Sequence, residues 1–463
     1  MNTRDGLILK EKLSADIHDL AKKISKIKNN IIRVELPCPD IDPLTWLNNQ
    51  KSSKKFYWSD RKGNFEMAGI GVADTLKGND STDYKSVFTL LQQNLTCNIK
   101  NLRYYGGVSF FNKKQTGIWK LFGSYYFVIP QFEILKIKEK IYFAFNIAKS
   151  DITPEKINKC IKELKCLSFS CDELRFFTPE IGFIKNIPEK AQWANIFKKI
   201  IKPADGMILE KIVLAKKTVV EFTNKLNYLG LFYLLKKHTK NCFHYYFQLS
   251  KDTVFLGASP EQLLRVNGSK VESEAIAGTK PRGLTRKEDK FLLQKLINSN
   301  KEMIEHQFVV NMIYNTLNKF CLSLHYDNEF SILKVSTCQH LITHFRGILK
   351  NDIKSYDALL ALHPTPAVAG CPTDKALDII SEVEPFERGW YAGPIGFVGH
   401  NCFEFAVALR CAMIKGLKAN LYAGAGIVEG SIAEEEWYEI ENKSSIFMSI
   451  FKNILDYDKS FKN

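Results

Sequence analysis

Strand-like segments follow one another closely in the second half of this 463-residue chain, and helical segments lie between groups of strands. Short alternating or apolar runs bounded by turn formers predict strands at residues 209–220, 244–249, 253–256, 263–266 and 271–276. Turn formers such as Asn267-Gly268 separate some of these strands, which is typical of an antiparallel meander. Helical spacing of apolar residues then predicts one long helix over residues 285–320.

A second block repeats this grouping. Strands predicted at residues 390–398, 403–414 and 421–428 precede a final helix over residues 432–455. Elements that group in this way favour an α+β fold over a doubly wound parallel sheet.

The first half of the chain has fewer signals. Strand-like runs at residues 104–111, 125–129 and 140–147 lie among lysine-rich helical stretches. The segment 177–193, interrupted by Pro179 and Pro188, is the predicted linker between the two halves.

The formal charge of +15 is spread along the chain. Most basic residues are lysines in scattered pairs such as Lys22-Lys23, with acidic residues between them, whereas a nucleic-acid site needs clustered lysine and arginine. A solvated lysine-rich surface is therefore favoured over a nucleic-acid partner. A net positive field would still help to attract a small polyanion.

The cysteines and the apolar runs indicate the compartment. The eleven cysteines include no Cys-x-x-Cys pair, so zinc-site spacing is absent and reduced thiols are the simplest interpretation. No apolar segment follows the charged start, and nowhere do eighteen apolar residues run together. We expect a cytoplasmic protein without a membrane span.

Two residues have the chemistry of a base and an acid. Lys211 opens a strand-like run and shares a face with Val213 and Ala215, so it can be partly desolvated, which favours its neutral form. Glu261 follows Pro260 in a tight segment that could point a carboxyl group from a sheet edge into a cleft. Taken singly, each also fits an ordinary role as a strand-edge charge or a turn carboxylate.

Carboxylates recur on one face of two predicted helices. One set has the spacing i, i+3, i+4 and the other i, i+3, i+7, and the sets are Glu302, Glu305 and His306, and Glu436, Glu439 and Lys443. Two helices that each offer two carboxylates could hold a hard divalent cation, of which Mg²⁺ is the natural choice. Acidic residues at a helix start and a surface pair are the alternatives.

A glycine-rich strand end and an arginine suggest an anion site. In Gly424-Ala425-Gly426 the glycines would let backbone N–H groups approach an anion closely. Arg410, on the neighbouring strand, could bind a carboxylate through two hydrogen bonds. A plain turn and a structural ion pair are the alternatives.

Taken in order, these stretches resemble the chorismate-utilising (anthranilate synthase component I-like) enzyme family, and most of all its isochorismate synthases of the menaquinone type. The resemblance spans roughly residues 200–455 and rests on these motifs: Lys211-Ile-Val-Leu-Ala, Phe255-Leu-Gly-Ala-Ser-Pro-Glu261, Ala277-Gly-Thr-Lys-Pro-Arg-Gly283, Glu305-His306, Leu362-His-Pro-Thr-Pro-Ala367, Arg388-Gly-Trp-Tyr-Ala-Gly-Pro394, and Tyr422-Ala-Gly-Ala-Gly-Ile-Val428 with Glu439 and Lys443.

The resemblance implies an Mg²⁺-dependent exchange of hydroxyl groups on chorismate, in which water adds at ring carbon 2 and the hydroxyl at carbon 4 departs. Lys211 matches the base that activates the water, and Glu261 matches the acid that protonates the leaving group. Glu305 and Glu439 match the metal ligands, with Glu302 and Glu436 in support. The substrate-binding positions that match are Gly278, Thr279, His306, His363, Arg410, Gly424, Ala425, Gly426 and Lys443.

The resemblance also implies the architecture. We expect large antiparallel sheets packed as a sandwich with outer helices, in which residues 1–180 complete the sheets and residues 190–457 form the chorismate-binding catalytic domain. The product would serve menaquinone biosynthesis or a siderophore or salicylate route. We expect a monomer without a glutaminase subunit.

Three alternatives stay open. A salicylate synthase would keep Lys211 and then eliminate pyruvate, but it differs in the segment that matches His363 to Ala367. The amine-adding relatives typically lack a lysine at position 211. A catalytically silent, basic binding protein predicts damaged catalytic positions and clustered basic residues, and the sequence has neither.

Overall fold

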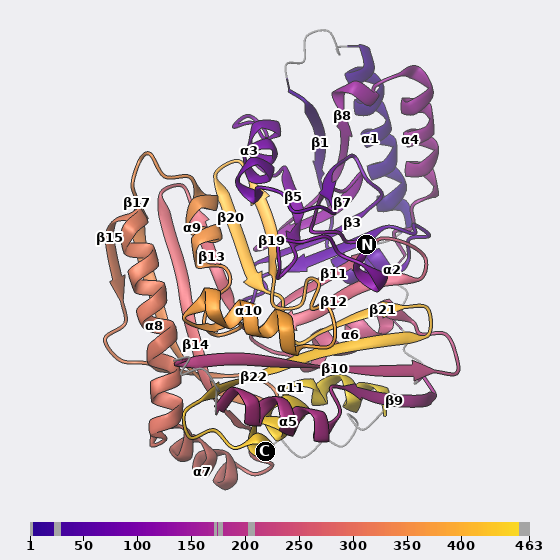
Figure 1. Cartoon of the computed structure of the whole chain (residues 1–463). Coiled ribbons are helices and arrows are strands. Elements are labelled where there is room, and N and C mark those ends of the chain that lie inside the picture. The colour runs from indigo at the N-terminus through magenta and orange to yellow at the C-terminus, as the bar shows by residue number, and fades with distance from the viewer. Residues whose placement is uncertain (1–2, 23–28, 171–173, 175–178, 202–208, 453–463) are drawn as a thin grey trace.

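Two large antiparallel sheets form the centre of the protein (Figure 1). The computed structural model describes residues 3–22, 29–170, 174, 179–201 and 209–452. In spatial order, the twelve-stranded sheet contains β1 (Ile31–Pro37), β8 (Lys140–Ala148), β7 (Phe132–Ile137), β3 (Phe65–Ile70), β2 (Lys55–Ser59), β11 (Phe243–Gln248), β12 (Thr253–Ser259), β21 (Cys411–Lys415), β22 (Lys418–Val428), β10 (Lys211–Phe222) and β18 (Gly370–Cys371), and β9 (Ile181–Ile187) also pairs with β10.

The ten-stranded sheet takes strands from both halves of the chain as well. Its order is β15 (Cys321–Tyr326), β17 (Cys338–Leu349), β14 (Lys270–Pro281), β13 (Gln262–Asn267), β20 (Cys402–Val407), β19 (Pro394–Gly399), β5 (Arg103–Val108), β6 (Tyr125–Ile129) and β4 (Asp74–Gly78), and β16 (Ser331–Lys334) also pairs with β17. Strands of the first half thus continue both sheets, and the division into residues 1–180 and 190–457 stays a prediction.

The alternation of side chains along the strands produces a sandwich with outer helices. Phe56 and Trp58 of β2 belong to a core cluster that includes residues of both sheets, whereas Tyr57 belongs to a second cluster under the helices. The helices are α1 (Thr3–Lys22), α2 (Pro43–Asn48), α3 (Tyr84–Asn94), α4 (Pro154–Cys166), α5 (Lys190–Ile201), α6 (Tyr228–His238), α7 (Arg286–Ile297), α8 (Asn300–Phe320), α9 (Ser355–Leu362), α10 (Thr373–Val383) and α11 (Ala433–Phe451).

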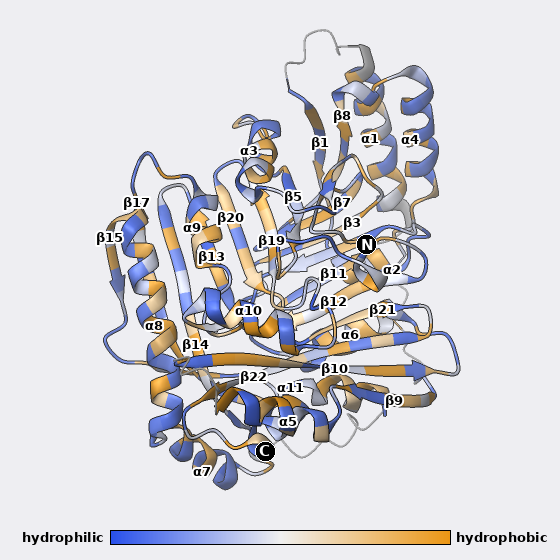
Figure 2. Ribbon diagram, in the orientation of Figure 1, coloured by the Kyte–Doolittle hydropathy of each residue, from blue (hydrophilic) through white to orange (hydrophobic). Residues whose placement is uncertain are grey.

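The helices that matter most for the site are α8 and α11. The first packs on β14, β15 and β17, and the second packs on β22, α5 and α6. Hydrophobic and hydrophilic residues recur along α8, as expected of a helix that covers a sheet with one face (Figure 2). Among the helices of the described ranges, none is both long and apolar enough to span a bilayer.

The predicted α+β fold is confirmed, but the predicted meander is correct only for the antiparallel pairs β11–β12 and β13–β14. Strands β10 and β11 are separated by β12, β21 and β22, and the chain changes sheets between β12 and β13. It changes sheets again between β20 and β21, so the strand predicted over residues 403–414 is two strands. The break falls at Arg410, whose φ of 46° is incompatible with an extended strand.

Two other predicted elements differ from the structure. The helix predicted over residues 285–320 is α7 and α8, separated at Ser299, whose side chain caps α8 by accepting a hydrogen bond from the Glu302 N–H. The predicted linker at 177–193 contains β9 and the start of α5, apart from residues 177 and 178, which lie outside the described residues. Part of the segment is therefore a strand of the twelve-stranded sheet, paired with β10, and part belongs to a helix.

Candidate active site

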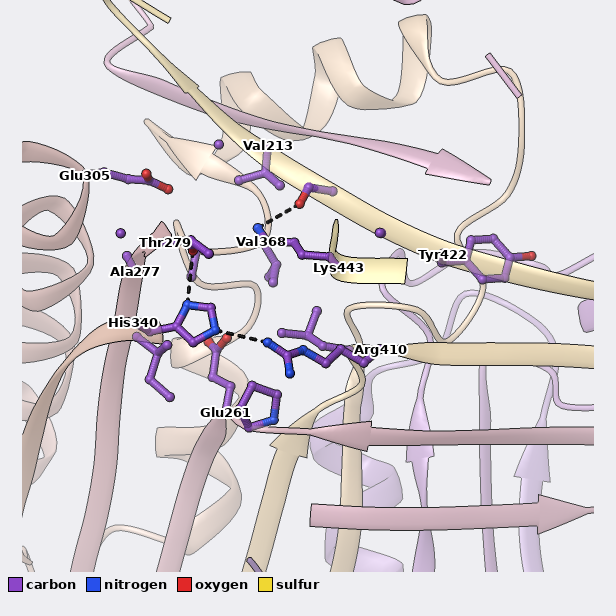
Figure 3. A pocket seen from close by; sticks show the side chains of 18 of the residues that line it. Val213, Glu261, Ala277, Thr279, Glu305, His340, Val368, Arg410, Tyr422 and Lys443 are labelled. Atoms are coloured by element: carbon purple, nitrogen blue, oxygen red, sulfur yellow. Dashed lines mark hydrogen bonds between the residues drawn. The ribbon is translucent and has the colours of Figure 1, made fainter. Parts of the chain in front are cut away.

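A cavity of about 80 Å³ lies where the two sheets exchange strands. The connections from β12 to β13 and from β20 to β21 supply Glu261 and Arg410. The rest of the wall comes from β10, β14, β17, β22, α8 and α11 and from the segments that contain Val368 and Tyr391. Figure 3 shows Glu261 near Arg410 and His340, with Glu305 on the opposite side. Residues from distant parts of the sequence thus face one small space.

Glu261 is a buried acid. Its residue is 4% exposed, and its backbone is held on both sides, because its N–H donates to Ser259 Oγ at 3.2 Å and its carbonyl oxygen accepts from the Val407 N–H at 3.1 Å. Burial raises the pKa of Glu261 to about 8, and the negative charge of Glu274 adds to the shift while Lys211 and Lys443 oppose it. The carboxyl group is therefore largely protonated at neutral pH.

Lys211 is buried beside the cavity, next to Glu305. Its Nζ lies 2.9 Å from Glu305 Oε1, and its side chain is 0% exposed. Glu305 lines the cavity, whereas Lys211 does not. A Cβ on Gly426 would lie 2.4 Å from Glu305 Oε1 and 3.0 Å from Lys211 Cε, so this close packing requires glycine.

The predicted carboxylates lie on α8 and α11, and each is paired with a lysine. The pairs are Glu302 with Lys280 (2.8 Å), Glu305 with Lys211 (2.9 Å), Glu436 with Lys301, and Glu439 with Lys443 (2.7 Å). Three of the four (Glu302, Glu436 and Glu439) line a second cavity of about 340 Å³, and Thr279 lies on the boundary because it lines both.

The electrostatics of this group favour a cation. Burial raises the pKa of Glu302, and the nearby charges of Glu305 and Glu439 raise it further. Burial also raises the pKa of Glu436, with Glu439 as the next cause. Although burial opposes it, Lys211 holds the pKa of Glu305 below its usual value. Carboxylates that repel one another are stabilised by positive charge, which the lysines supply here.

The donor atoms fit Mg²⁺ in kind, because carboxylate oxygens are the hard ligands that this ion takes in proteins. Within the described ranges, no three histidine, cysteine, aspartate or glutamate side chains are grouped closely enough to hold a metal ion in the present arrangement. Binding would therefore require carboxylates such as Glu305 and Glu439 to turn from their lysine partners. Mg²⁺ at this group of carboxylates stays a prediction.

A β-bulge positions Thr279. The pairing of β14 with β17 shifts register between Ala277 and Thr279, and Gly278 takes the positive φ of 74° that the bulge needs. The Thr279 N–H is thereby directed to Glu302 Oε2 at 2.8 Å. Gly278 and Thr279 both line the cavity.

Lys443 and the strand β22 form the opposite wall. The Lys443 ammonium donates to the Gly424 carbonyl oxygen at 3.0 Å. Although burial opposes it, the Glu439 carboxylate raises the pKa of Lys443, so this side chain is a fixed positive charge. Gly424 and Gly426 line the cavity, whereas Ala425 points into the core between the sheets.

Two predicted histidines lie outside the lining of this cavity. His306 is buried on α8, where its Nε2 contacts Thr343 Oγ1 at 2.9 Å. His363 precedes Pro364 and packs edge-on against Phe110, with ring centroids 6.0 Å apart. Burial lowers the pKa of each to about 4, so both rings are neutral at pH 7.

The sequence patterns missed His340, which lies in the lining of the cavity. Its Nδ1 contacts Thr279 Oγ1 at 3.1 Å, and its Nε2 contacts Arg410 Nη2 at 3.1 Å (Figure 3). Burial, together with the charges of Arg410 and Lys443, lowers the pKa of His340, so its neutral ring can accept from Arg410. Tyr391, which the sequence analysis quoted within a motif but gave no role, also lines the cavity, next to Gly424.

The chain is similar to known proteins over most of its length. A family model described as "Chorismate binding enzyme" matches residues 18–452. Isochorismate synthase MenF of Escherichia coli (strain K12) is 29% identical over 90% of this chain and 92% of its own length. A chloroplastic isochorismate synthase of Catharanthus roseus is 29% identical over 96% of this chain and 84% of its own length.

A solved structure shares the whole architecture. The structure of MenF, described as the menaquinone-specific isochorismate synthase from Escherichia coli, is 28% identical in sequence and superposes with a TM-score of 0.82 over 95% of this chain and 99% of that one. Because the family model spans nearly the whole chain and the fold is shared throughout, this chain belongs to the chorismate-binding enzyme family.

Proposed function

We propose that this protein is an Mg²⁺-dependent isochorismate synthase that converts chorismate to isochorismate. The observation that carries the proposal is one cavity with the buried Glu261, whose pKa is raised by burial, on one side and Glu305, paired with Lys211, on the other. A reaction in which water enters and hydroxide leaves needs both a base and an acid, since water is a poor nucleophile and hydroxide a poor leaving group.

Glu261 supplies the proton. Its raised pKa keeps it protonated at neutral pH, and it gives the proton to the hydroxyl on carbon 4 of chorismate, which leaves as water. Glu261 is then a carboxylate in a buried site, where its charge is unfavourable, so it regains a proton from solvent before the next turnover.

Lys211 removes a proton from the water that attacks carbon 2. Its Nζ contacts the Glu305 carboxylate in this structure, so this contact must separate and Nζ must give a proton to solvent before the neutral amine can act as a base. After the reaction Lys211 gives the proton that it has gained to solvent, which balances the proton that Glu261 takes up from solvent.

Glu305 and Glu439 are the proposed Mg²⁺ ligands, with Glu302 and Glu436 in support. When bound, the ion would neutralise the ring carboxylate of chorismate and fix the ring in place. Two positive groups suit the second carboxylate of the substrate, because Arg410, between β20 and β21, and Lys443, on α11 like Glu439, both line the cavity. His340 holds the Arg410 side chain through a hydrogen bond.

The likeness to MenF supports a role in menaquinone biosynthesis, because that relative is described as menaquinone-specific. We further propose that the protein acts as a monomer without a glutaminase subunit.

Product analysis tests the proposal. Purified protein is incubated with chorismate and Mg²⁺, and isochorismate, salicylate and pyruvate are separated by chromatography, with a parallel reaction that contains ammonium to detect anthranilate. We expect isochorismate as the main product and none in the presence of EDTA. Dominant salicylate and pyruvate, or anthranilate, would overturn the proposal.

A further inference from the structure

A buried arginine that does not line the cavity joins two segments of its wall. Arg388 follows α10, and its side chain is 1% exposed. It is paired with Glu384, the C-cap residue of α10, whose side chain is 4% exposed. Arg388 Nε and Nη2 donate to the two Glu384 oxygens at 2.8 and 2.6 Å, so the contact is bidentate.

The other hydrogen bonds of this pair reach the backbone of the cavity wall. Arg388 Nη1 donates to the Val368 carbonyl oxygen and Nη2 to the Val213 carbonyl oxygen, each at 2.8 Å. Glu384 Oε1 accepts from the Ala215 N–H at 2.8 Å. The pair therefore ties β10 to the segment before β18.

That wall includes the proposed base. Val213 and Val368 line the cavity, and Lys211 lies two residues before Val213 on β10. The short strand β18 pairs with Lys211 and Ile212, and the Val213 N–H donates to the Ala369 carbonyl oxygen at 2.8 Å. The position of Lys211 relative to Glu261 thus depends on how firmly the two segments are joined.

We propose that Arg388, oriented by Glu384, is a positioning residue that fixes the Lys211 strand against the Val368 segment and so sets the distance between the base and the acid. This inference rests on the proposed function. The groups proposed to hold the substrate, Arg410 and Lys443, come from the β20–β21 connection and from α11. Loss of the Arg388 contacts should therefore affect turnover more than substrate binding.

The test is Arg388→Lys, which keeps the positive charge and loses the planar fork. A second variant, Glu384→Gln, keeps an acceptor for the Ala215 N–H and loses the ion pair. The matched control is Arg33→Lys, because Arg33 forms an equally buried ion pair with Glu133. Both residues belong to the twelve-stranded sheet that contains β10, and neither lines the cavity. All three are assayed well below their thermal midpoints.

We expect kcat of Arg388→Lys to fall about 100-fold, the loss typical of a misplacement of about 1 Å, with KM changed less than about threefold. Glu384→Gln should lose less in the same direction. Arg33→Lys should lose thermal stability and keep its kcat. A wild-type kcat in Arg388→Lys, or an equal loss in Arg33→Lys, would overturn the inference.

Hydrogen exchange separates this inference from the proposed function. The amides of residues 211–215 and 367–371 should exchange faster in Arg388→Lys than in the wild type or in Arg33→Lys. Unchanged exchange of these amides would contradict the proposal that Arg388 joins the two segments, whatever the activity. If the wild-type protein does not form isochorismate, the proposed function fails, and the exchange measurement alone decides whether Arg388 joins the two segments.

Discussion

Replacing Gly426 with alanine tests the tight packing of Lys211 against Glu305. The added Cβ would lie 2.4 Å from Glu305 Oε1 and 3.1 Å from its Cδ, and 3.0 Å from Lys211 Cε. Ordinary contact at such a Cβ begins at 3.4 Å, so the Glu305 carboxylate must move by about 1 Å. Both the proposed base and the proposed metal ligand would be displaced.

The expected loss follows from that displacement. A misplacement of about 1 Å at a reacting group costs about 100-fold in rate, which corresponds to about 2.7 kcal/mol of transition-state stabilisation. Folding should change little, because glycine in a strand interior is itself unfavourable by roughly 0.5–1 kcal/mol relative to alanine. The result should be a stable protein with a kcat about 100-fold lower, measured by chromatographic separation of isochorismate from chorismate.

Gly182→Ala is the matched control, since Gly182 lies on β9, where a Cβ would be 3.2 Å from Thr223 Cγ2 and 3.5 Å from the Glu221 carbonyl oxygen. This variant should keep the wild-type rate. If Gly426→Ala also turns over at the wild-type rate, the packing of Lys211 against Glu305 is not needed for catalysis and the reasoning is wrong.

Other predictions concern protons and the metal. The wild-type rate should fall as pH rises through about 8, where Glu261 loses its proton, and Glu261→Gln should form no isochorismate at any pH. The folded-state pKa of Glu261 lies above its ordinary 4.5, so the stability that Glu261 contributes is complete below about pH 4.5 and is lost as pH rises through 8. The thermal midpoint of Glu261→Gln should therefore be higher than that of the wild type at pH 9 and not at pH 4. Burial is the main cause of this raised pKa, and the charge of Glu274 adds to it. Glu274→Gln should therefore move the alkaline limb of the pH–rate profile to lower pH, and an unmoved limb would show that Glu274 does not raise the pKa of Glu261. Glu439→Gln should raise the Mg²⁺ concentration for half-maximal activity while the exposed control Glu382→Gln leaves it unchanged, and equal Mg²⁺ curves for both would exclude Glu439 as a ligand.

Local patterns predicted much of this molecule because its site residues occur within short motifs. The helical spacing of Glu302 with Glu305, and of Glu436 with Glu439, depends only on the geometry of one helix, and the structure has both pairs on helices beside the cavity region. The family resemblance supplied what spacing alone could not, namely that these helices come together.

The failures have non-local causes. His340 is a single histidine in β17, and its contacts with Thr279 and Arg410 arise only when β17 pairs with β14 and the β20–β21 connection lies over them. The two changes of sheet fall at Pro260 and at Arg410. At Arg410 the chain turns through a positive φ on a non-glycine residue, which leaves no signal in the sequence. The break before α8 did have a signal, the Ser299 to Glu302 spacing of a capping box, which the long apolar periodicity outweighed.

In the proposed reaction, solvent water enters at carbon 2 while a protonated Glu261 releases the hydroxyl at carbon 4. Turnover of chorismate with Mg²⁺ in water enriched in ¹⁸O, followed by mass spectrometry of the isolated isochorismate, measures this directly. We expect one ¹⁸O atom per isochorismate, located on carbon 2, in the wild-type reaction and no labelled product with Lys211→Ala. Isochorismate that forms without the label would contradict it, because the hydroxyl would then have migrated within the substrate.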